Sequence, residues 1–482
     1  MSAPAANGPY TLPLIFNGKD YYTEKTFDVI SPSTAKILYR SSAVSVADSN
    51  KAVELAAEAL KSWRNTTPAQ RRDIMLKAAD NMARRSDELV NLMSTDTGTT
   101  DEWSKINVDA GVDMIKACAG LIPTLEGTFP TLNDPDMSGI MIKEPYGVVF
   151  AIAPWYELPY VLGTRSIAFP LAAGNTVVFK GSELSPRTMW GIASCFQEAG
   201  LPDGVLNFIA HAPGDGAEIT SAIISHPEVK KINFTGSTNV GRVIGRLAGD
   251  YTKPVILELG GKAPAIVWED ADIELAAFHC ALGAFMNSGQ ICMSTEKIIV
   301  HKSIKSKFAK ALVAAVAKRY PGSDDAPVLI NSAAVKKNKA LVENAQGKGG
   351  NLLTGNPSAE ESTATRLRPI VVDNVTTDMD IYNQESFGPT VSLLEVDTEE
   401  EALRLANDTE YGLSSSVYTE NLRTGLRFAR QIEAGAVHIN AQTVHDEPCL
   451  PHGGVKGSGY GRFNGVRGLD EWVRTKNITF RK

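Results

Sequence analysis

The stretch GVVFAIAP at residues 147–154 is a nearly continuous apolar run that ends in proline. Three similar runs follow it along the chain: NTVVFK (175–180), VLNFIA (205–210) and VKKINF (229–234). Each run is short, is soon followed by Gly, Pro or Ser, and is separated from the next by a helix-like stretch. Buried parallel strands joined by crossover helices give this alternation. The sequence therefore predicts an α/β protein with a doubly wound, Rossmann-type domain over roughly residues 1–250.

The regions on either side of these runs extend the α/β pattern. Apolar residues recur at three- and four-residue spacing over Ala47–Trp63 and Pro68–Met93, which predicts two early helices. A second α/β region begins near KPVILELGGKAPAIV (253–267), includes the helix-like stretch DIELAAFHCALGAFM (272–286) and extends to about residue 450. The last strand-like piece, TKNITF (475–480), is expected to pair with another subunit or with a hairpin near 124–145.

Length and charge narrow the class of protein. The chain has 482 residues, which is too long for one ordinary core and predicts two or more domains. Its 48 Lys and Arg against 55 Asp and Glu give a net charge of −7. An acidic balance argues against a general binder of nucleic acid or of anionic membranes. A run of about 18 apolar residues is absent from the sequence, so no transmembrane helix is predicted.

The N-terminus and the cysteines indicate a reducing compartment. MSAPAANGPYTLPLIFNG has no charged segment followed by an apolar one, so we expect a flexible lead of about nine residues and then a first strand, not a signal peptide. The five cysteines show no CxxC or zinc spacing, and their odd number argues against a disulfide framework. We expect a cytoplasmic protein without a metal site. The cysteines are Cys118, Cys195, Cys280, Cys292 and Cys449.

A phosphate-binding turn is one interpretation of FTGSTNVGRVIG (234–245). An apolar strand ends at Phe234, and a Gly/Ser/Thr turn leads into a helix that starts near Thr238. Backbone N–H groups at a helix start attract phosphate, and Gly236 lets the backbone approach closely. The alternative is an ordinary helix start with Ser237 or Thr238 as the capping side chain.

Two loops place carboxylates where they suit ribose hydroxyls. In NTVVFKGSELSP (175–186), Lys180 and Glu183 follow a strand end, where ligands bind in open α/β sheets. A carboxylate there favours NAD over a 2′-phosphorylated cofactor. In NQESFGP (383–389), Glu385 and Phe387 suit a ribose edge and a ring face. Each pair taken alone also fits a solvated surface loop.

Cys292 and Glu258 are the candidate nucleophile and base. Cys292 lies in FMNSGQICMSTEK (285–297), after a glycine-containing loop where backbone amides can lower the pKa of a thiol. Most free cysteines are small buried hydrophobic residues, and this alternative applies here. Glu258, between an apolar strand and two glycines in LELGGK (257–262), supplies a general base for such a nucleophile. The alternative for Glu258 is a structural carboxylate paired with Lys262.

Taken together, these segments resemble the aldehyde dehydrogenase superfamily over nearly the whole chain. The motifs occur in the family's order: IAPW (152–155), KGSE (180–183), FTGST (234–238), LELGGK (257–262), GQIC (289–292) and ESFGP (385–389). The resemblance implies NAD(P)-dependent oxidation of an aldehyde to the acid through a Cys292 thiohemiacetal and a thioester. Glu258 is implied to activate the hydrolytic water. NAD is the expected cofactor, with NADP as the alternative.

The same resemblance implies cofactor contacts and a domain plan. The implied cofactor residues are Ile152, Trp155, Lys180, Glu183, Gly214, Gly236, Ser237, Gly241, Glu385 and Phe387. We expect an NAD-binding domain over 1–123 and 146–252, a catalytic domain over 253–450 and an oligomerisation element over 124–145 and 466–482. The expected assembly is a homodimer or homotetramer.

A finer resemblance is to the branch that acts on vanillin, benzaldehyde and salicylaldehyde. NSGQICMSTEKIIV (287–300) and TVHDEPCLPHGGVKGSGYGRFNG (443–465) are similar to stretches found there. An aromatic or unsaturated aldehyde is therefore the expected substrate, and thioether and aromatic side chains suit a flat apolar molecule. By this resemblance the substrate tunnel is lined by Met114, Glu157, Tyr160, Arg165, Met286, Ile291 and Met293.

One segment departs from the family pattern. The family usually has Asn directly after PW as an oxyanion donor, whereas this chain reads PWYELPY, with Tyr156 in that place and Glu157 beside it. Loss of one such donor costs about 10²–10³ in turnover. The backbone N–H of Cys292 remains as one donor, and Arg165 is a candidate to compensate or to bind a substrate oxygen.

The departure at Tyr156 keeps two other hypotheses open. One is a redox-neutral enzyme on the same scaffold that isomerises the double bond of an unsaturated aldehyde by reversible addition of Cys292. The other is a non-catalytic binding relative, which the presence of both Cys292 and Glu258 disfavours.

Overall fold

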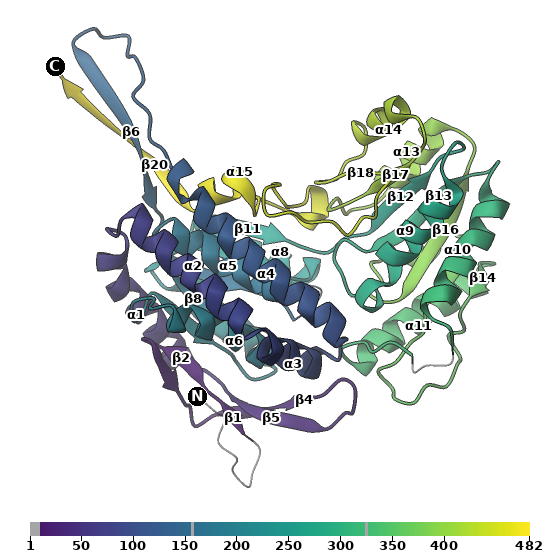
Figure 1. Ribbon diagram of the computed structural model, residues 1–482, viewed down its shortest axis with the longest axis horizontal. Helices are drawn as coiled ribbons and strands as arrows, with labels where there is room; N and C mark the ends of the chain where they lie inside the picture. The colour runs from purple at the N-terminus through teal and green to yellow at the C-terminus, as the bar shows by residue number, and fades with distance from the viewer. Residues whose placement is uncertain (1–9, 156–158, 323–325) are drawn as a thin grey trace.

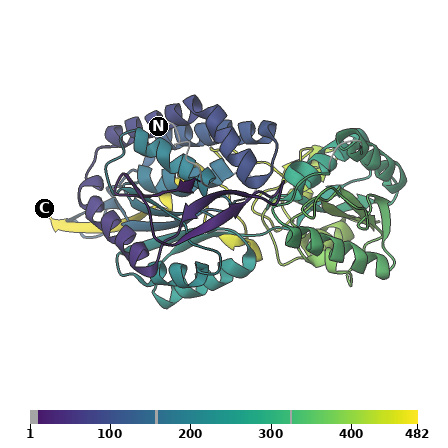
Figure 2. The same ribbon diagram turned by 90° about the horizontal axis from the view of Figure 1, so that it is seen from below.

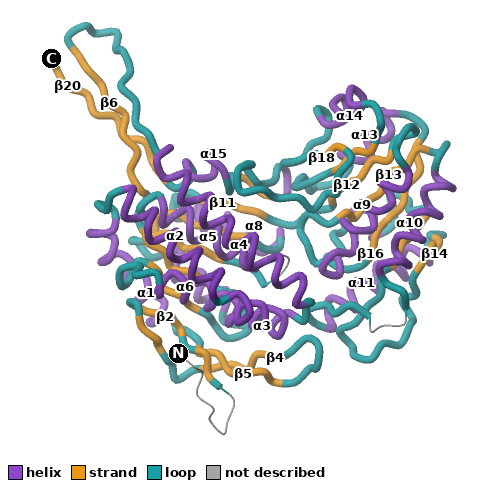
Figure 3. The backbone as a smooth tube through the Cα atoms, viewed as in Figure 1, coloured by secondary structure: helices purple, strands orange, loops and turns teal. Residues whose placement is uncertain are grey.

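The computed structural model describes residues 10–155, 159–322 and 326–482. Figures 1 and 2 show two lobes side by side and a two-stranded arm that extends from the first lobe, away from the second. Figure 3 shows strands and helices alternating through both lobes. The lead expected over the first nine residues lies outside the described residues, and β1 (Thr11–Leu12) follows it.

The first lobe, within the described ranges, is built on an eight-stranded sheet of order β19-β11-β10-β7-β8-β9-β2-β3. The four apolar runs form its parallel centre, as predicted, and Phe150 lies opposite Val178 on one side and Ile232 on the other. β7 and β8 are buried along their whole length, which explains why their sequences do not alternate. The strands are β2 (Leu14–Phe16), β3 (Lys19–Tyr21), β7 (Val148–Ile152), β8 (Thr176–Lys180), β9 (Leu206–Ile209), β10 (Val229–Thr235), β11 (Val255–Glu258) and β19 (Gly459–Tyr460).

Helices cover this sheet, and one expected helix is two. The stretch from Pro68 to Met93 breaks at Arg85, whose guanidinium is buried against the next layer and donates to Ser194 and Glu198 at 2.8 Å each. Because neither Gly nor Pro marks the break, apolar spacing alone did not reveal it. The helices are α1 (Val46–Trp63), α2 (Pro68–Arg84), α3 (Ser86–Thr97), α4 (Asp101–Leu121), η1 (Ile122–Thr124), α5 (Pro159–Ala172), α6 (Pro186–Glu198), α7 (Gly216–Ser225) and α8 (Thr238–Asp250).

The second lobe has its own sheet, of order β14-β15-β16-β13-β12-β17-β18 in the described part of the chain. Its strands are β12 (Ala263–Val267), β13 (Thr295–His301), β14 (Asn351–Thr354), β15 (Ile370–Asp373), β16 (Thr390–Val396), β17 (Ser416–Tyr418) and β18 (His438–Ile439). Its helices are α9 (Ile273–Phe285), η2 (Met286–Gly289), α10 (Lys305–Arg319), α11 (Ser332–Gly347), α12 (Asp380–Asn383), α13 (Glu399–Asn407) and α14 (Leu422–Ala429).

The crossing between the lobes lies later than the expected boundary at residue 252. β11 pairs in parallel with β10, with Thr235 opposite Glu258, so it belongs to the first sheet. The chain enters the second sheet only at β12, after the two glycines of LELGGK. An apolar strand has the same sequence pattern in either sheet, and only its pairing partner decides where it belongs. The functional division into cofactor and catalytic domains stays a prediction.

The C-terminal strand forms the arm together with an upstream segment of the same chain. β20 (Val473–Arg481) runs antiparallel to β6 (Met137–Pro145), with Asn477 opposite Met141. The expected partner near 124–145 is therefore confirmed. A small sheet of β1, β5 (Ile37–Ser42) and β4 (Thr26–Ile30) lies beside the first lobe, and η3 (Lys456–Ser458) and α15 (Gly465–Asp470) precede the arm. None of the helices in the described ranges has the length and apolar character that a membrane crossing requires.

Candidate active site

A cavity of about 1020 Å³ opens beyond the carboxyl ends of β7, β8 and β10. In the sheet order, β8 and β9 follow β7 on one side while β10 and β11 follow on the other, so the strand order reverses there. Ligands of open α/β sheets bind at such a point. Eight of the predicted cofactor residues line this cavity: Ile152, Trp155, Lys180, Glu183, Gly236, Ser237, Glu385 and Phe387.

Two predicted cofactor glycines do not line it. A Cβ on Gly241 would lie 2.3 Å from a methyl carbon of Leu259, so this glycine allows α8 to pack closely against the end of β11. Gly214 has φ +93° in the turn before α7, whereas its neighbours His211 and Gly216 reach the cavity. Both glycines lie next to residues of the cavity wall but are not part of its lining.

The start of α8 retains its hydrogen-bonding capacity. Ser237 is the N-cap residue by position, as the alternative interpretation expected, but its hydroxyl makes no capping hydrogen bond. The first-turn N–H groups of α8 follow directly, and Ser237 and Asn239 line the cavity. A hydroxyl that makes no capping hydrogen bond, beside a helix N-terminus, is suited to an anionic group such as a phosphate.

The opposite wall is a loop that a buried ion pair holds in place. Lys262 and Glu296 pair at 2.5 Å, and the Glu296 carboxylate accepts from the backbone N–H of Ser386 at 2.8 Å and of Phe387 at 3.0 Å. The sequence hypothesis that pairs Lys262 with Glu258 is therefore wrong. Glu296 lies inside the quoted segment 285–297. Its sequence spacing gave no indication that it would accept from the backbone of Ser386, which is 90 positions further along the chain.

Glu385 lies in the same wall, and its pKa is strongly shifted. Its carboxylate accepts from the backbone N–H of Gly261 at 2.7 Å. Burial, followed by the charge of Glu296, raises the pKa of Glu385 and the Gly261 N–H lowers it, with a net value of about 7. Trp155 and Phe387 meet edge to face, with ring centroids 6.2 Å apart, at the same end of the cavity.

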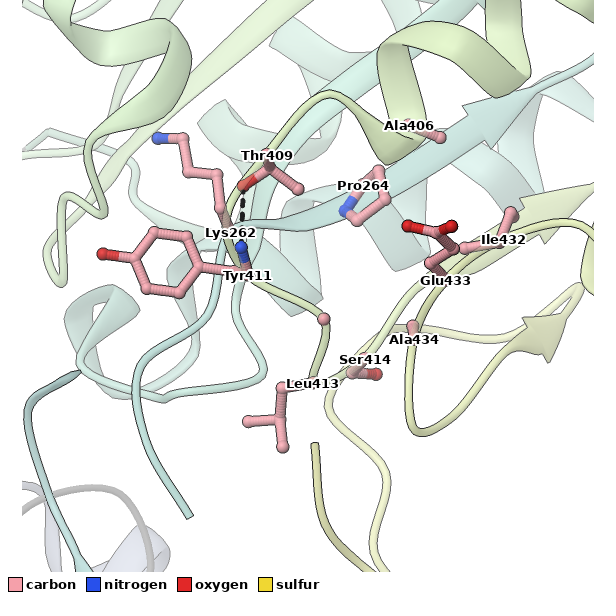
Figure 4. A pocket seen from close by; sticks show the side chains of 11 residues that line it. Lys262, Pro264, Ala406, Thr409, Tyr411, Leu413, Ser414, Ile432, Glu433 and Ala434 are labelled. Carbon is pink, nitrogen blue, oxygen red and sulfur yellow. Dashed lines mark hydrogen bonds between the residues drawn. The ribbon is translucent and has the colours of Figure 1, made fainter. Parts of the chain in front are cut away.

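A much smaller cavity lies behind Lys262, and Figure 4 shows the side chains around it. Its volume is about 10 Å³, and the Thr409 hydroxyl accepts from the backbone N–H of Tyr411 beside it at 3.2 Å. A space of this size holds one water molecule at most. It is too small to hold a substrate.

Cys292 follows a strained turn. Asn287, Ser288 and Gly289 have φ of +46°, +60° and +69°, a left-handed run that non-glycine residues adopt at a cost of about 1–3 kcal/mol each. Side chains hold it: the Gln290 amide donates to Val328 O at 3.3 Å. The approach of the LELGGK segment is equally tight, because a Cβ on Gly261 would lie 2.1 Å from the carbonyl oxygen of Cys292.

The Cys292 thiol points at Glu258. Its Sγ donates to Glu258 Oε1 at 3.0 Å, and both side chains are buried. Glu258 ends β11 of the first sheet and Cys292 follows η2 of the second lobe, so the contact joins the two lobes. A thiol and a carboxylate in hydrogen-bond contact have the chemistry to act as nucleophile and base.

An apolar cluster surrounds the thiol. Of the predicted tunnel residues, Met286, Ile291 and Met293 belong to it. Sequence reasoning missed three other members: Trp103, Leu413 and Val444. These residues carry no motif, and only the fold places them beside Cys292.

Two other predicted tunnel residues lie in the core of the first lobe. Met114 and Tyr160 are buried there, and the Tyr160 hydroxyl donates to Leu89 O at 2.6 Å. Because this bond directs the Tyr160 hydroxyl into that core, we leave Tyr160 out of the proposed tunnel. Tyr156 and Glu157, which carry the predicted departure at the oxyanion position, lie outside the described residues.

A buried ring of charges surrounds Glu258. Arg165 forms an ion pair with Glu258 Oε2 and a second one with Asp446 Oδ2 at 3.1 Å. His452 lies between the same two carboxylates, with Nε2 3.7 Å from Glu258 Oε1 and Nδ1 3.7 Å from Asp446 Oδ1. The four side chains are 1–8 % exposed. Asp446 and His452 fall in the quoted segment 443–465, but no role was predicted for them.

These charges set the ionisation of Glu258. Burial alone would raise the pKa of Glu258, but the Arg165 guanidinium, followed by His452 and the Cys292 thiol, lowers it to about 2. Glu258 is therefore a carboxylate at neutral pH. Arg165, the candidate substrate contact, is 1 % exposed and is directed at two carboxylates. Its charge therefore acts on the pKa of Glu258.

The fold and this site define an aldehyde-oxidising class of oxidoreductase, and the chain belongs to the aldehyde dehydrogenase family: the family's sequence model matches residues 20–478. It is 39 % identical over 475 residues to a vanillin dehydrogenase of Pseudomonas fluorescens, covering 97 % of each chain. It is 38 % identical over 468 residues to a salicylaldehyde dehydrogenase of Pseudomonas putida, covering 95 % of each.

Solved structures agree with this assignment. A salicylaldehyde dehydrogenase from Pseudomonas putida G7, complexed with salicylaldehyde, superposes with a TM-score of 0.94 at 36 % identity, covering 98 % of each chain. A betaine aldehyde dehydrogenase of Staphylococcus aureus in complex with NAD⁺ gives 0.91 at 31 %, covering 97 % of this chain and 96 % of that one. The protein is thus an aldehyde dehydrogenase that uses a nicotinamide cofactor. The hypothesis of a redox-neutral isomerase receives no support from these comparisons.

Proposed function

We propose that Cys292 is the nucleophile and Glu258 the base of this aldehyde dehydrogenase. The observation that carries the proposal is the 3.0 Å contact from Sγ to Oε1. The thiolate adds to the aldehyde carbon and forms a thiohemiacetal, which becomes a thioester once its hydride has left. The Glu258 carboxylate then accepts a proton from water as the water attacks the thioester, and the acid leaves.

The large cavity fits a nicotinamide dinucleotide by its set of donors and acceptors. Ser237 and the start of α8 suit the pyrophosphate, Glu183 and Glu385 suit ribose hydroxyls, and Phe387 offers a ring face. The bound nicotinamide supplies the hydride acceptor. The protein residues that line the cavity hold and orient it.

We further propose that the substrate is an aromatic aldehyde. The apolar cluster at Cys292, which includes Trp103, supports this, as do the relatives named for vanillin and salicylaldehyde. Burying a ring contributes about 2–3 kcal/mol, so we expect kcat/KM for salicylaldehyde to exceed that for acetaldehyde by about 10²-fold. The absorbance of reduced cofactor measures both. Trp103→Ala should lower the aromatic value alone, and an equal loss for acetaldehyde would contradict the proposal.

Cofactor binding is expected to depend on pH through Glu385. The pKa of Glu385, raised to about 7, leaves the carboxyl largely protonated at pH 6, whereas ribose hydroxyls donate best to the carboxylate. Binding therefore releases a proton below pH 7, and Kd for NAD should rise about tenfold from pH 8 to pH 6. Fluorescence titration measures it. Glu385→Gln should bind more weakly with a flat profile, and a slope equal to that of wild type would assign the dependence to another group.

We propose NAD as the preferred cofactor. Glu183 lines the cavity near Lys180, where its carboxylate can accept from ribose hydroxyls and repel a 2′-phosphate. Glu183→Gln should shift the ratio of the two dissociation constants towards NADP by about tenfold, or 1.4 kcal/mol. Titration of the wild type and of Glu183→Gln with NAD and with NADP measures the ratio. An unchanged ratio would remove Glu183 from cofactor selection.

We propose a cytoplasmic homodimer or homotetramer assembled through the arm. β20 and β6 leave Ile478 and Phe480 exposed, and an exposed strand pair is a ready surface for pairing with another copy. Within the described ranges, the cysteines form no disulfide. Light scattering on the full chain gives the oligomer count.

A further inference from the structure

We propose that His452 receives the proton of the Cys292 thiol through Glu258, and so acts as a positioning residue that maintains the thiolate. This inference rests on the proposed role of Cys292 as the nucleophile. His452 belongs to none of the predicted site residues, and its involvement follows from its position in the buried ring of Glu258, Arg165, Asp446 and His452.

The geometry aligns three groups on one oxygen. Glu258 Oε1 accepts from Cys292 Sγ at 3.0 Å, and His452 Nε2 lies 3.7 Å from that same Oε1. The other ring nitrogen, Nδ1, faces Asp446 Oδ1 at 3.7 Å. The remaining carboxylate oxygens are both occupied by Arg165. The carboxylate oxygen that accepts from the thiol is thus the one that the imidazole faces.

The charges favour an internal proton transfer. With a neutral imidazole, the ring holds two carboxylates and one guanidinium, so a new thiolate would add a second uncompensated negative charge in a buried place. In the transfer, the S–H bond breaks and an O–H bond forms on Oε1. That O–H bond breaks as Nε2–H forms, once the imidazole has moved from 3.7 Å to hydrogen-bond distance of Oε1. The thiolate and the imidazolium appear together, and the net charge of the buried site stays the same.

The ionisation of each group agrees with this direction. Glu258, whose pKa is lowered to about 2, is a poor final holder of a proton. Burial and Arg165 lower the pKa of His452, but Asp446 and Glu258 outweigh them and raise it above its ordinary value. Beyond the ring, burial, followed by the neighbouring His445 and His452, lowers the pKa of His438 of β18 to about 4. Asn464 donates to Asp446 at 2.7 Å and fixes that carboxylate.

The pH dependence of Cys292 alkylation tests the proposal without aldehyde or cofactor. Iodoacetamide reacts with the thiolate, and mass spectrometry locates the label. His452→Gln retains hydrogen-bonding groups but cannot take up a proton at neutral pH. We expect the midpoint of its labelling profile to rise by about one pH unit and its rate at pH 7 to fall about tenfold. His445→Gln, a change at a nearby histidine whose side chain is 43 % exposed, is the matched control and should follow the wild type.

A second measurement uses the wild-type enzyme, so a folding defect in a variant does not decide the result. With ¹³C at histidine Cε1, one resonance should report an imidazolium at neutral pH, and its midpoint should fall when Cys292 is carboxamidomethylated, because the thiolate charge is removed. Two outcomes would overturn the relay alone. One is a labelling profile of His452→Gln that overlaps that of the wild type. The other is a set of histidine resonances that does not change when Cys292 is carboxamidomethylated. Absence of label on Cys292 in the wild type would overturn the proposed nucleophile as well.

Discussion

Replacement of Cys292 by alanine is expected to lower kcat for aldehyde oxidation by about 10⁴-fold or more. The thiol forms the only covalent bond to substrate in the proposed reaction, so no other group in the site can replace it. Cys292 does not line the large cavity, and Kd for NAD should therefore change by less than about twofold. Single-turnover formation of reduced cofactor and a separate binding titration measure the two quantities.

Cys449→Ala is the matched control for this substitution. Cys449 is exposed, whereas Cys292 is buried, so replacement of Cys449 should leave kcat near the wild-type value. Turnover by Cys292→Ala within tenfold of wild type would contradict covalent catalysis at this residue. Loss of cofactor binding in the same variant would instead mean that the strained turn had collapsed.

The second large effect is expected on stability, from Arg165→Met. Arg165 is the cation between two buried carboxylates, Glu258 and Asp446, and its guanidinium also lies 4.6 Å from the centroid of the Phe463 ring. Methionine fills much of the same volume but leaves both carboxylates without that partner. Removal of one member of a buried ion pair costs about 3–5 kcal/mol. We expect a lower apparent melting temperature at pH 7 and a lower kcat.

The pH dependence of this loss has a definite sign. In the wild type, the pKa of Glu258 is lowered from 4.5 to about 2, so Glu258 contributes stability above pH 4.5 that is lost as the pH falls towards 2. Without Arg165 that contribution disappears, and burial raises the pKa of Glu258. The difference in melting temperature between the two enzymes should therefore shrink as the pH falls from 7 towards 4.5. A difference that is constant across this range would indicate lost packing, not lost charge pairing.

Arg427→Met provides the control for Arg165→Met. Arg427 pairs with Glu399 through two contacts, one of them at 2.7 Å, but its side chain is 48 % exposed. Exposed pairs of this kind contribute little to stability, because water and salt screen the two charges. The melting temperature of Arg427→Met should stay close to that of the wild type. A loss as large as that of Arg165→Met would remove burial as the explanation.

The sequence predicted the site best where the reactive residues lie in short motifs. Cys292, Glu258 and Glu385 each lie within three residues of a glycine, because a backbone turn must bring a polar side chain to a sheet edge. Eight cofactor residues predicted from such motifs line one cavity. The tunnel was harder to predict, since Trp103, Leu413 and Val444 are ordinary apolar residues whose role depends on which elements pack together.

By itself, the sequence determined the fold class, the family and the pairing of a thiol with a carboxylate, because apolar runs, turn glycines and reactive side chains are local properties. Only the tertiary structure decided that β11 belongs to the first sheet, that the helix from Pro68 breaks at Arg85, and that Lys262 pairs with Glu296. It also decided that Arg165, Asp446 and His452 enclose Glu258. Electrostatic interactions between buried groups depend on distance in space, and residues 281 positions apart along the chain carry no local signal that they will meet.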